Sequence, residues 1–179
     1  NFLKYSGTLD PTDVGTLTNT FRYKNFSLSA NINYEFGAVT RLRSITNTDD
    51  YSAFPRELTQ RWKKPGDEKH TDIPRLPTSY AFDQYGADNL INAYYAYGAS
   101  TARIVSTDFI RLKEISMEYT VSKTLLRRTP LKNLAVKLQA QNLMLLYSDA
   151  RLRGDDPEYM YSSSVTAPKK LILTLRVGL

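Results

Sequence analysis

Apolar and polar residues alternate strictly between Phe26 and Phe36. Every even-numbered position in this segment is apolar and every odd-numbered position is polar, which is the pattern of a β-strand with two different faces. An ordinary strand has about 5–6 residues, whereas a tilted transmembrane strand needs about 9–11, and this segment has the longer length. Residues 16–24 alternate less cleanly. Lys24 and Asn25 then form a tight turn, in which Asn25 is expected to tolerate a positive φ.

The last third of the chain repeats this alternation. Between residues 107 and 121 the apolar positions change phase, so one extra residue near Lys113 and Glu114, a β-bulge, is expected there. Long loops are predicted over 38–106 and 147–168. Together the patterns predict five long strands, at about 16–24, 26–37, 107–121, 133–146 and 169–179.

The two faces of these strands differ in what they need around them. The apolar face has to be covered, and the remaining segments contain no clear amphipathic helix or second sheet to cover it. In a transmembrane barrel, lipid covers this face and the polar face lines the lumen. Short turns alternating with very long loops are also typical of outer-membrane barrels. The polar positions that would line such a pore are Asn31, Asn33, Glu35, Glu118, Lys137, Gln139 and Gln141.

A soluble β-domain with one wet face would show the same alternation. The chain has 13 Tyr, 7 Phe and 1 Trp, and Tyr is frequent both at binding surfaces and at membrane interfaces. The alternative interpretation is therefore a soluble, Tyr-rich β-domain that binds carbohydrate or a protein partner. The two interpretations differ in what covers the apolar face of 26–36 and 171–179, which is lipid in one and protein in the other.

Composition and charge remove several other classes. The chain has no Cys, which excludes disulfides and thiolate chemistry. Its net charge of +6 is concentrated in one short basic turn, at Lys123, Arg127, Arg128 and Lys132. Nucleic-acid binding requires a more continuous basic face and is not expected. Because the chain opens without an initiator Met or a signal peptide, we expect it to be a piece of a longer protein.

Five short motifs then resemble, in order, the late barrel of SusC/RagA-type TonB-dependent transporters. Residues 106–116 and 139–143 resemble strands of that family, and 156–158 resembles the acidic motif that follows the second of these strands. The segments are 20–29 (TFRYKNFSLS), 61–67 (RWKKPGD), 106–116 (STDFIRLKEIS), 139–143 (QAQNL) and 156–158 (DPE). The chain departs from the family pattern at Val121-Ser122-Lys123, where Pro is usual before Lys and where Ser122 is expected to cap a short turn of helix. It also departs at Leu179, where an aromatic residue is usual.

The resemblance implies an all-β fold in which residues 1–179 form about the last five strands of a 22-stranded antiparallel transmembrane barrel. It implies uptake of oligosaccharides or peptides across the outer membrane of a Gram-negative, Bacteroidetes-like bacterium. The implied partners are a SusD-type surface lipoprotein, outer-membrane lipid and, through an N-terminal part, the TonB complex. No enzymatic activity and no cofactor are implied.

Candidate chemistry within the chain is sparse. His70 lies among acids in a loop, where a solvated side chain is a better interpretation than a catalytic triad or a metal ligand with Asp67, Glu68 and Asp72. We therefore predict no catalytic residue and no metal site. Aromatic side chains in the loops are the better candidates for contact with a ligand or the lipoprotein. They are Trp62, Tyr80, Tyr85, Tyr94, Tyr95, Tyr159 and Tyr161, with Phe82 and Tyr97 nearby.

Overall fold

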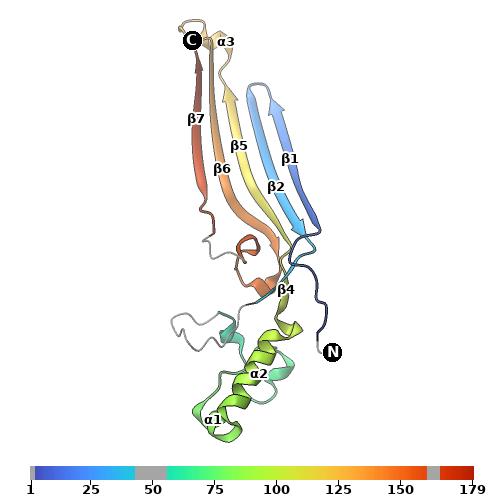
Figure 1. Ribbon diagram of the computed structural model, residues 1–179. Coiled ribbons are helices and arrows are strands. Elements are labelled where there is room, and N and C mark those ends of the chain that lie inside the picture. Colours follow the sequence, from blue (N-terminus) through green and yellow to red (C-terminus); the bar gives the residue numbers. More distant parts are fainter. Residues whose placement is uncertain (1–2, 43–55, 161–165) are drawn as a thin grey trace.

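A computed structural model describes residues 3–42, 56–160 and 166–179. These residues form mostly antiparallel β-structure, with a small helical region beyond one end of the sheet (Figure 1). The main sheet has five strands in the order β1-β2-β5-β6-β7, and it is open, with β1 and β7 at its edges. These strands are β1 (Asp13–Tyr23), β2 (Phe26–Phe36), β5 (Phe109–Thr120), β6 (Asn133–Ser148) and β7 (Lys170–Gly178).

The strands lie where the alternation places them, although their ends differ by up to three residues. The largest difference is at β1, which begins at Asp13 and not at residue 16. Gly15 obscures this extension in the sequence because it has no side chain to continue the pattern. Tyr34 lies directly opposite Gly15, and its ring fills the space that a side chain would take, since a Cβ on Gly15 would be 2.3 Å from the Tyr34 hydroxyl.

The expected β-bulge is present in β5. Asn31 of β2 pairs with Glu114 and Ile32 pairs with Leu112, so Lys113 is the additional residue. Strand β6 is also irregular at this level, where Asn142 adopts a left-handed conformation with φ 55°. A bulge restores the alternation on both sides of it, and this explains the change of phase along β5.

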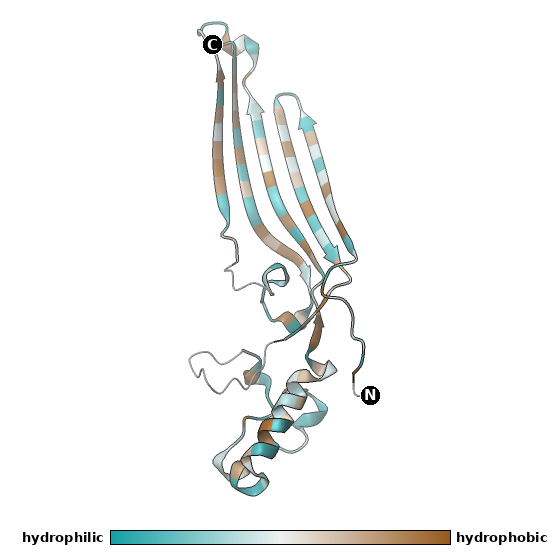
Figure 2. Ribbon diagram, viewed as in Figure 1, coloured by the Kyte–Doolittle hydropathy of each residue, from teal (hydrophilic) through white to brown (hydrophobic). Residues whose placement is uncertain are grey.

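The register aligns residues of one kind in rows across the sheet. One row runs Phe21, Leu28, Met117, Leu138, Leu173, each residue directly opposite the next. The adjacent row, on the other face, begins at Thr20 and runs through Ser29, Ser116 and Gln139. Figure 2 shows the resulting alternation of hydrophobic and hydrophilic colours along the strands. The sheet therefore has one apolar face and one polar face.

The two ends of the sheet are built differently. At one end, here called the hairpin end, lie the β1–β2 turn, helix α3 (Lys123–Leu126) and the end of β7 (Figure 1). Lys24, with φ 52°, takes the left-handed conformation in the turn, so the expectation for Asn25 was wrong. The Asn25 side-chain amide instead donates to the carbonyl of Thr120 at 2.7 Å. Ser122 is at the N-cap of α3, but its side chain makes no capping hydrogen bond.

The opposite end, here called the loop end, carries regular structure that the sequence analysis did not anticipate. A second small sheet pairs β3 (Val39–Arg41) with β4 (Ile104–Ser106). Two helices follow one another, α1 (Ser79–Tyr85) and α2 (Ala87–Ala99). Short 3-10 turns cover Arg56–Gln60, Asp67–Lys69, Thr101–Arg103, Ala150–Leu152 and Pro157–Tyr159. In the described part of the chain, every helix is too short or too polar to cross a membrane.

Helix α2 escaped the sequence analysis because its three tyrosines suit a strand or a binding loop as well as a helix. Leu90, Tyr94 and Tyr97, spaced i, i+4, i+7, are half-buried, as is Gly98. This is the spacing of one helix face. Leu58 and Ile73 form a small core, against which Leu76 and Tyr97 pack. Burial is concentrated at this end, whereas Leu171 and Leu173 on the apolar face of the sheet are 73% and 71% exposed.

Candidate functional site

The polar face of the main sheet carries side chains that form hydrogen bonds between neighbouring strands. Glu114 lies at its centre and accepts hydrogen bonds from Gln139 at 3.1 Å and from Gln141 at 2.9 Å. Toward the β1 edge, Thr16 donates to Asn33 at 3.3 Å. These contacts link neighbouring strands through side chains as well as through the backbone ladder, so the face is a connected polar surface.

All seven residues that the sequence proposes as pore lining lie on this one face. Asn31 and Asn33 reach it from β2, and Glu118 and Lys137 face each other across β5 and β6. The seven are half-buried, which is consistent with side chains that lie along a sheet surface. They are Asn31, Asn33, Glu35, Glu118, Lys137, Gln139 and Gln141. Their assignment to a pore stays a prediction.

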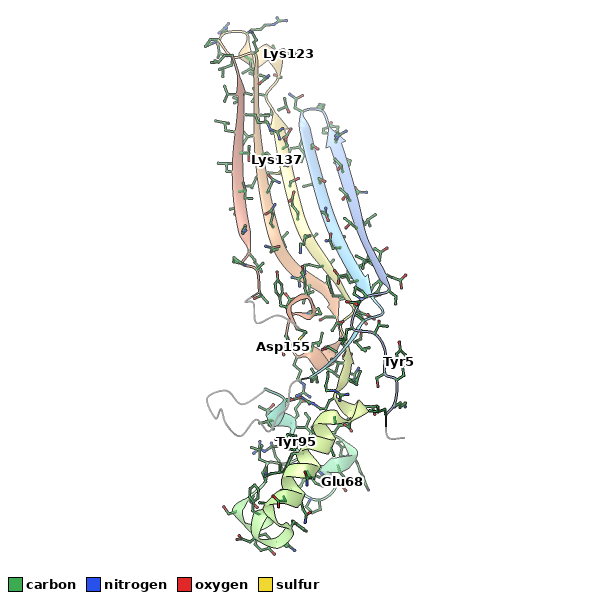
Figure 3. All side chains as sticks on the ribbon, in the orientation of Figure 1. Tyr5, Glu68, Tyr95, Lys123, Lys137 and Asp155 are labelled. Atoms are coloured by element: carbon green, nitrogen blue, oxygen red, sulfur yellow. The ribbon has the colours of Figure 1, made fainter. Side chains whose placement is uncertain are left out.

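A groove runs along the hairpin half of this face. Its lining includes Arg22, Ser29, Asn31, Glu118, Lys123 and Lys137, and Figure 3 labels Lys137 in the sheet and Lys123 at the hairpin end. Glu118 is also 3.4 Å from Arg176 of β7. The groove thus combines hydroxyl, amide and charged groups of both signs, which suits the recognition of a polar solute.

The segment that follows β6 turns back over the polar face, and we call residues 149–160 the strap. Arg111, which is 7% exposed, forms an ion pair with Asp156 of the strap. Its Nε also lies 3.1 Å from Oε2 of Glu158. Lys113 reaches the same carboxylate, with its Nζ 3.0 Å from Oε1. Two cations of β5 therefore hold two acids of the strap.

The strap also contacts the structure at the loop end. Arg151 donates to the carbonyl of Ile104 in β4 at 3.1 Å. Asp149 accepts from the backbone N–H of Ser106 at 3.4 Å and pairs with Arg151 at 2.9 Å. The guanidinium of Arg151 holds the pKa of Asp149 below its usual range. By these contacts the strap joins the main sheet to the small β3–β4 sheet.

A buried ion pair orders the helical region. Arg103 lies between Glu57 and Tyr97, and two of its nitrogens donate to the two Glu57 oxygens at 2.7 Å each. The Tyr97 ring centroid is 5.4 Å from the guanidinium carbon. A bidentate pair of this kind fixes orientation as well as distance.

The candidate loop aromatics divide into two groups. Trp62 donates to Glu68 at 3.0 Å, and the Tyr94 hydroxyl donates to the carbonyl of Arg75, so these two hold the region together. Tyr80, Tyr85 and Tyr95 are 72%, 57% and 73% exposed on α1 and α2 and are free to contact another molecule.

Two further candidates lie in the last loop. Tyr159, at the end of the strap, is half-buried. Tyr161 lies outside the described residues.

The turn around His70 is ordered by carboxylates. Asp67 accepts from the backbone N–H groups of Lys63 at 3.0 Å and Lys64 at 3.1 Å, and these two bonds lower its pKa. Glu68 accepts from the N–H of Gly66 at 2.6 Å in addition to Trp62. Both acids are therefore used in shaping the turn. Among the described residues, no group of three or more acids or histidines is arranged to hold a metal ion.

Comparison with known proteins gives a structural likeness. No protein-family model matches the chain, and no curated protein matches it. The RagAB peptide importer in its 'open-open' state is similar with a TM-score of 0.64 and 19% identity, over 98% of this chain and 18% of that chain. In the 'closed-closed' state the TM-score is 0.56 with 22% identity, over 87% of this chain and 15% of that chain. The fold is shared with part of these importer chains. This chain spans less than a fifth of their length.

Sequence reasoning missed three residues that organise the polar face. Glu114 follows the bulge, where the alternation gives no sign of which face a residue occupies. Arg111 and Asp156 each belong to a motif that was noticed separately, RLK and DPE. Their contact joins residues that are 45 positions apart in the chain. The only sign of it in the sequence was that one motif is basic and lies in a strand, whereas the other is acidic and lies in a loop.

Proposed function

We propose that this chain forms part of the wall and mouth of an outer-membrane, TonB-energised nutrient importer. The observation that carries the proposal is the register of the sheet, which collects the apolar positions of all five strands in shared rows on one face. In the described residues this face has no covering layer, and Leu171, Leu173 and Leu175 are 73%, 71% and 62% exposed on it. Lipid covers such a face without a second layer of protein.

The two sheet edges support the same proposal. Strands β1 and β7 each have one side without a partner strand in the described residues. An open edge is unfavourable in hydrocarbon because its backbone groups have no hydrogen-bond partners. Further strands would therefore pair with β1 and β7, and the structural likeness to part of a much longer importer chain supports a barrel that continues beyond both edges.

In this proposal, the polar face lines the passage and the strap narrows it near the loop end. Peptides are the first substrate class to test, because the similar solved chains belong to a peptide importer; oligosaccharides are the second class. The family resemblance adds a SusD-type lipoprotein at the mouth and the TonB complex on the other side of the membrane. The exposed Tyr80, Tyr85 and Tyr95 are suited to contact such a partner or the substrate.

The alternative, a soluble Tyr-rich β-domain that binds carbohydrate or a protein, requires protein over the apolar face. In residues 3–42, 56–160 and 166–179 no element covers that face, and its edge-strand leucines stay largely exposed. The alternative is for this reason less well supported than the importer.

Two adjacent positions of β7 test the proposal. Leu173 belongs to the apolar face, and Ile172 lies opposite Gln139 on the polar face. Spin-labelled Leu173→Cys and Ile172→Cys variants would be compared in membranes with a lipid-soluble and a water-soluble relaxation agent. We expect the label at 173 to respond to the lipid-soluble agent and the label at 172 to the water-soluble one. A protein recovered in the soluble fraction, or equal responses at the two positions, would contradict the proposal.

A further inference from the structure

The hairpin end is rich in basic residues, and the proposed function uses only those that line the polar face. Residues 19–28, 119–138 and 171–179 meet there, and together they contain eight Lys or Arg residues and no Asp or Glu. All acidic residues of the chain lie outside these three segments. Glu118, directly before the second segment, faces Lys137 and pairs with Arg176. The excess of positive charge at this end therefore rests on the other cations.

Four of these cations, Lys123, Arg127, Arg128 and Lys132, belong to the connection between β5 and β6. We call residues 121–132 the basic turn. Arg127, Arg128 and Lys132 are exposed there, and none of the three has an ion pair within the described part of the chain. Lys123 differs from them, because it lines the groove on the polar face.

The basic turn is held in one conformation by the strands beside it. The N–H of Val121 donates to the carbonyl of Leu134, and that of Lys132 to the carbonyl of Gly178, both at 2.8 Å. Leu126 anchors the middle of the turn and is 7% exposed. Cations presented from a fixed backbone lose less conformational entropy on binding than cations on a flexible loop.

Apolar and aromatic groups accompany the cations. Leu125 is 66% exposed on the basic turn. The apolar face of the sheet ends nearby in a row of aromatics, in which Tyr23, Phe26 and Tyr119 lie opposite one another. Aromatic rings followed by basic side chains are typical of the boundary between hydrocarbon and headgroups.

We propose that the basic turn binds the headgroups of anionic phospholipids in the membrane leaflet at the hairpin end. This inference rests on the proposed function, because it requires the apolar face to lie in a bilayer. Arginine matches a phosphodiester with two parallel hydrogen bonds, and lysine adds a point charge. The exposed Leu125 distinguishes a lipid from a soluble polyanion, since it can enter the acyl region while the neighbouring cations hold the phosphate.

The test uses the intact protein in nanodiscs of phosphatidylcholine with increasing amounts of phosphatidylglycerol. Native mass spectrometry after mild release would measure how many phosphatidylglycerol molecules stay bound, for the unmodified protein and for an R127Q/R128Q/K132Q variant. Each cation near an anionic surface contributes about a fivefold preference. We therefore expect the triple variant to lose roughly a hundredfold in its preference for the anionic lipid. R127K/R128K should keep most of it, because the charge is unchanged.

A matched control removes three charges at the loop end of the structure. K63Q/K64Q/K69Q alters exposed lysines beside the helical region and should leave the lipid preference unchanged. Equal losses in both triple variants, or no loss in either, would overturn the inference. Competition by inorganic phosphate at the same concentration would indicate a general anion site and would also overturn it. A protein that embeds in the discs without lipid preference refutes this inference alone, whereas one that fails to embed refutes the proposed function as well.

Discussion

Nζ of Lys113 lies 3.0 Å from Oε1 of Glu158, although 45 residues separate the two in the chain. The contact depends on the β-bulge, because Lys113 is the additional residue of β5 at that level. A bulge redirects the side chain it carries, and here it gives the strap a second cation beside Arg111. The irregularity that disturbs the alternation in the sequence thus also helps to attach the last loop.

The Arg111–Asp156 pair should contribute more to stability than its neighbour. The two side chains are 9% and 12% exposed, against 35% and 30% for Lys113 and Glu158. Removing one member of a buried pair leaves the other charge unpaired, so Arg111→Met should lower the free energy of unfolding by about 3 kcal/mol. Lys113→Gln should cost less than about 1 kcal/mol. Urea unfolding followed by the heat-modifiable gel shift would measure both, and equal effects would contradict this ranking.

Replacing Arg103 by lysine should destabilise the helical region. Lysine keeps the charge but cannot donate to both Glu57 oxygens at once. We expect Arg103→Lys to destabilise the helical region by about 1–3 kcal/mol, seen as faster hydrogen exchange in residues 56–106. Arg75→Lys is the matched control, since the exposed Arg75 contributes a backbone carbonyl to the contact with Tyr94. Exchange in β6 should stay unchanged in both variants.

The turn around Asp67 should open in acid. Backbone hydrogen bonds lower the pKa of Asp67 below 3.8. The folded form of the turn therefore binds the proton less tightly than the unfolded form. Its stabilisation is present above pH 3.8 and is lost as the pH falls through the lowered pKa.

Trp62, which donates to Glu68 in the same turn, can report this opening. The fluorescence difference between the protein and its Trp62→Phe variant should change as the pH falls below 3.8. Asp67→Asn should produce the acid spectrum at neutral pH. A transition centred well above pH 3.8 would show that another group controls the turn.

Arginine on the two faces of β7 should have opposite consequences. In a bilayer, Leu173→Arg should destabilise the protein by about 2–4 kcal/mol, because the charge enters hydrocarbon. Ile172→Arg should be tolerated, since position 172 lies opposite Gln139 on the polar face. Folding yield into vesicles, read from the heat-modifiable band, would compare the two. A larger loss for Ile172→Arg would indicate that the faces are reversed.

The main sheet could be predicted from the sequence because the side chains of a strand point to its two faces in turn. In β2, polar and apolar residues alternate without exception. The bulge was accessible for the same reason, as a break in that alternation. Helix α2 was missed because tyrosine suits a helix face, a strand or a binding loop equally well, so the spacing of Leu90, Tyr94 and Tyr97 did not stand out.

The residues of the candidate site could be predicted from the sequence only where they lie on strands. Periodicity assigns Gln139 and Gln141 to a face, but it says nothing about which loop folds over that face. Arg111, Asp156 and the Glu57–Arg103 pair depend on how distant segments meet. Their assignment requires the tertiary structure.

The hydrogen bond from Arg151 to the carbonyl of Ile104 affects how a force on the helical region would reach the main sheet. The strap is fixed to β5 at one side and to β4 at the other, and β4 leads directly into β5. The helical region is therefore connected to the main sheet in two ways, through the chain from β4 into β5 and through the strap. A partner that pulls on α2 would apply torque to β5, and this strand extends from the loop end to the hairpin end.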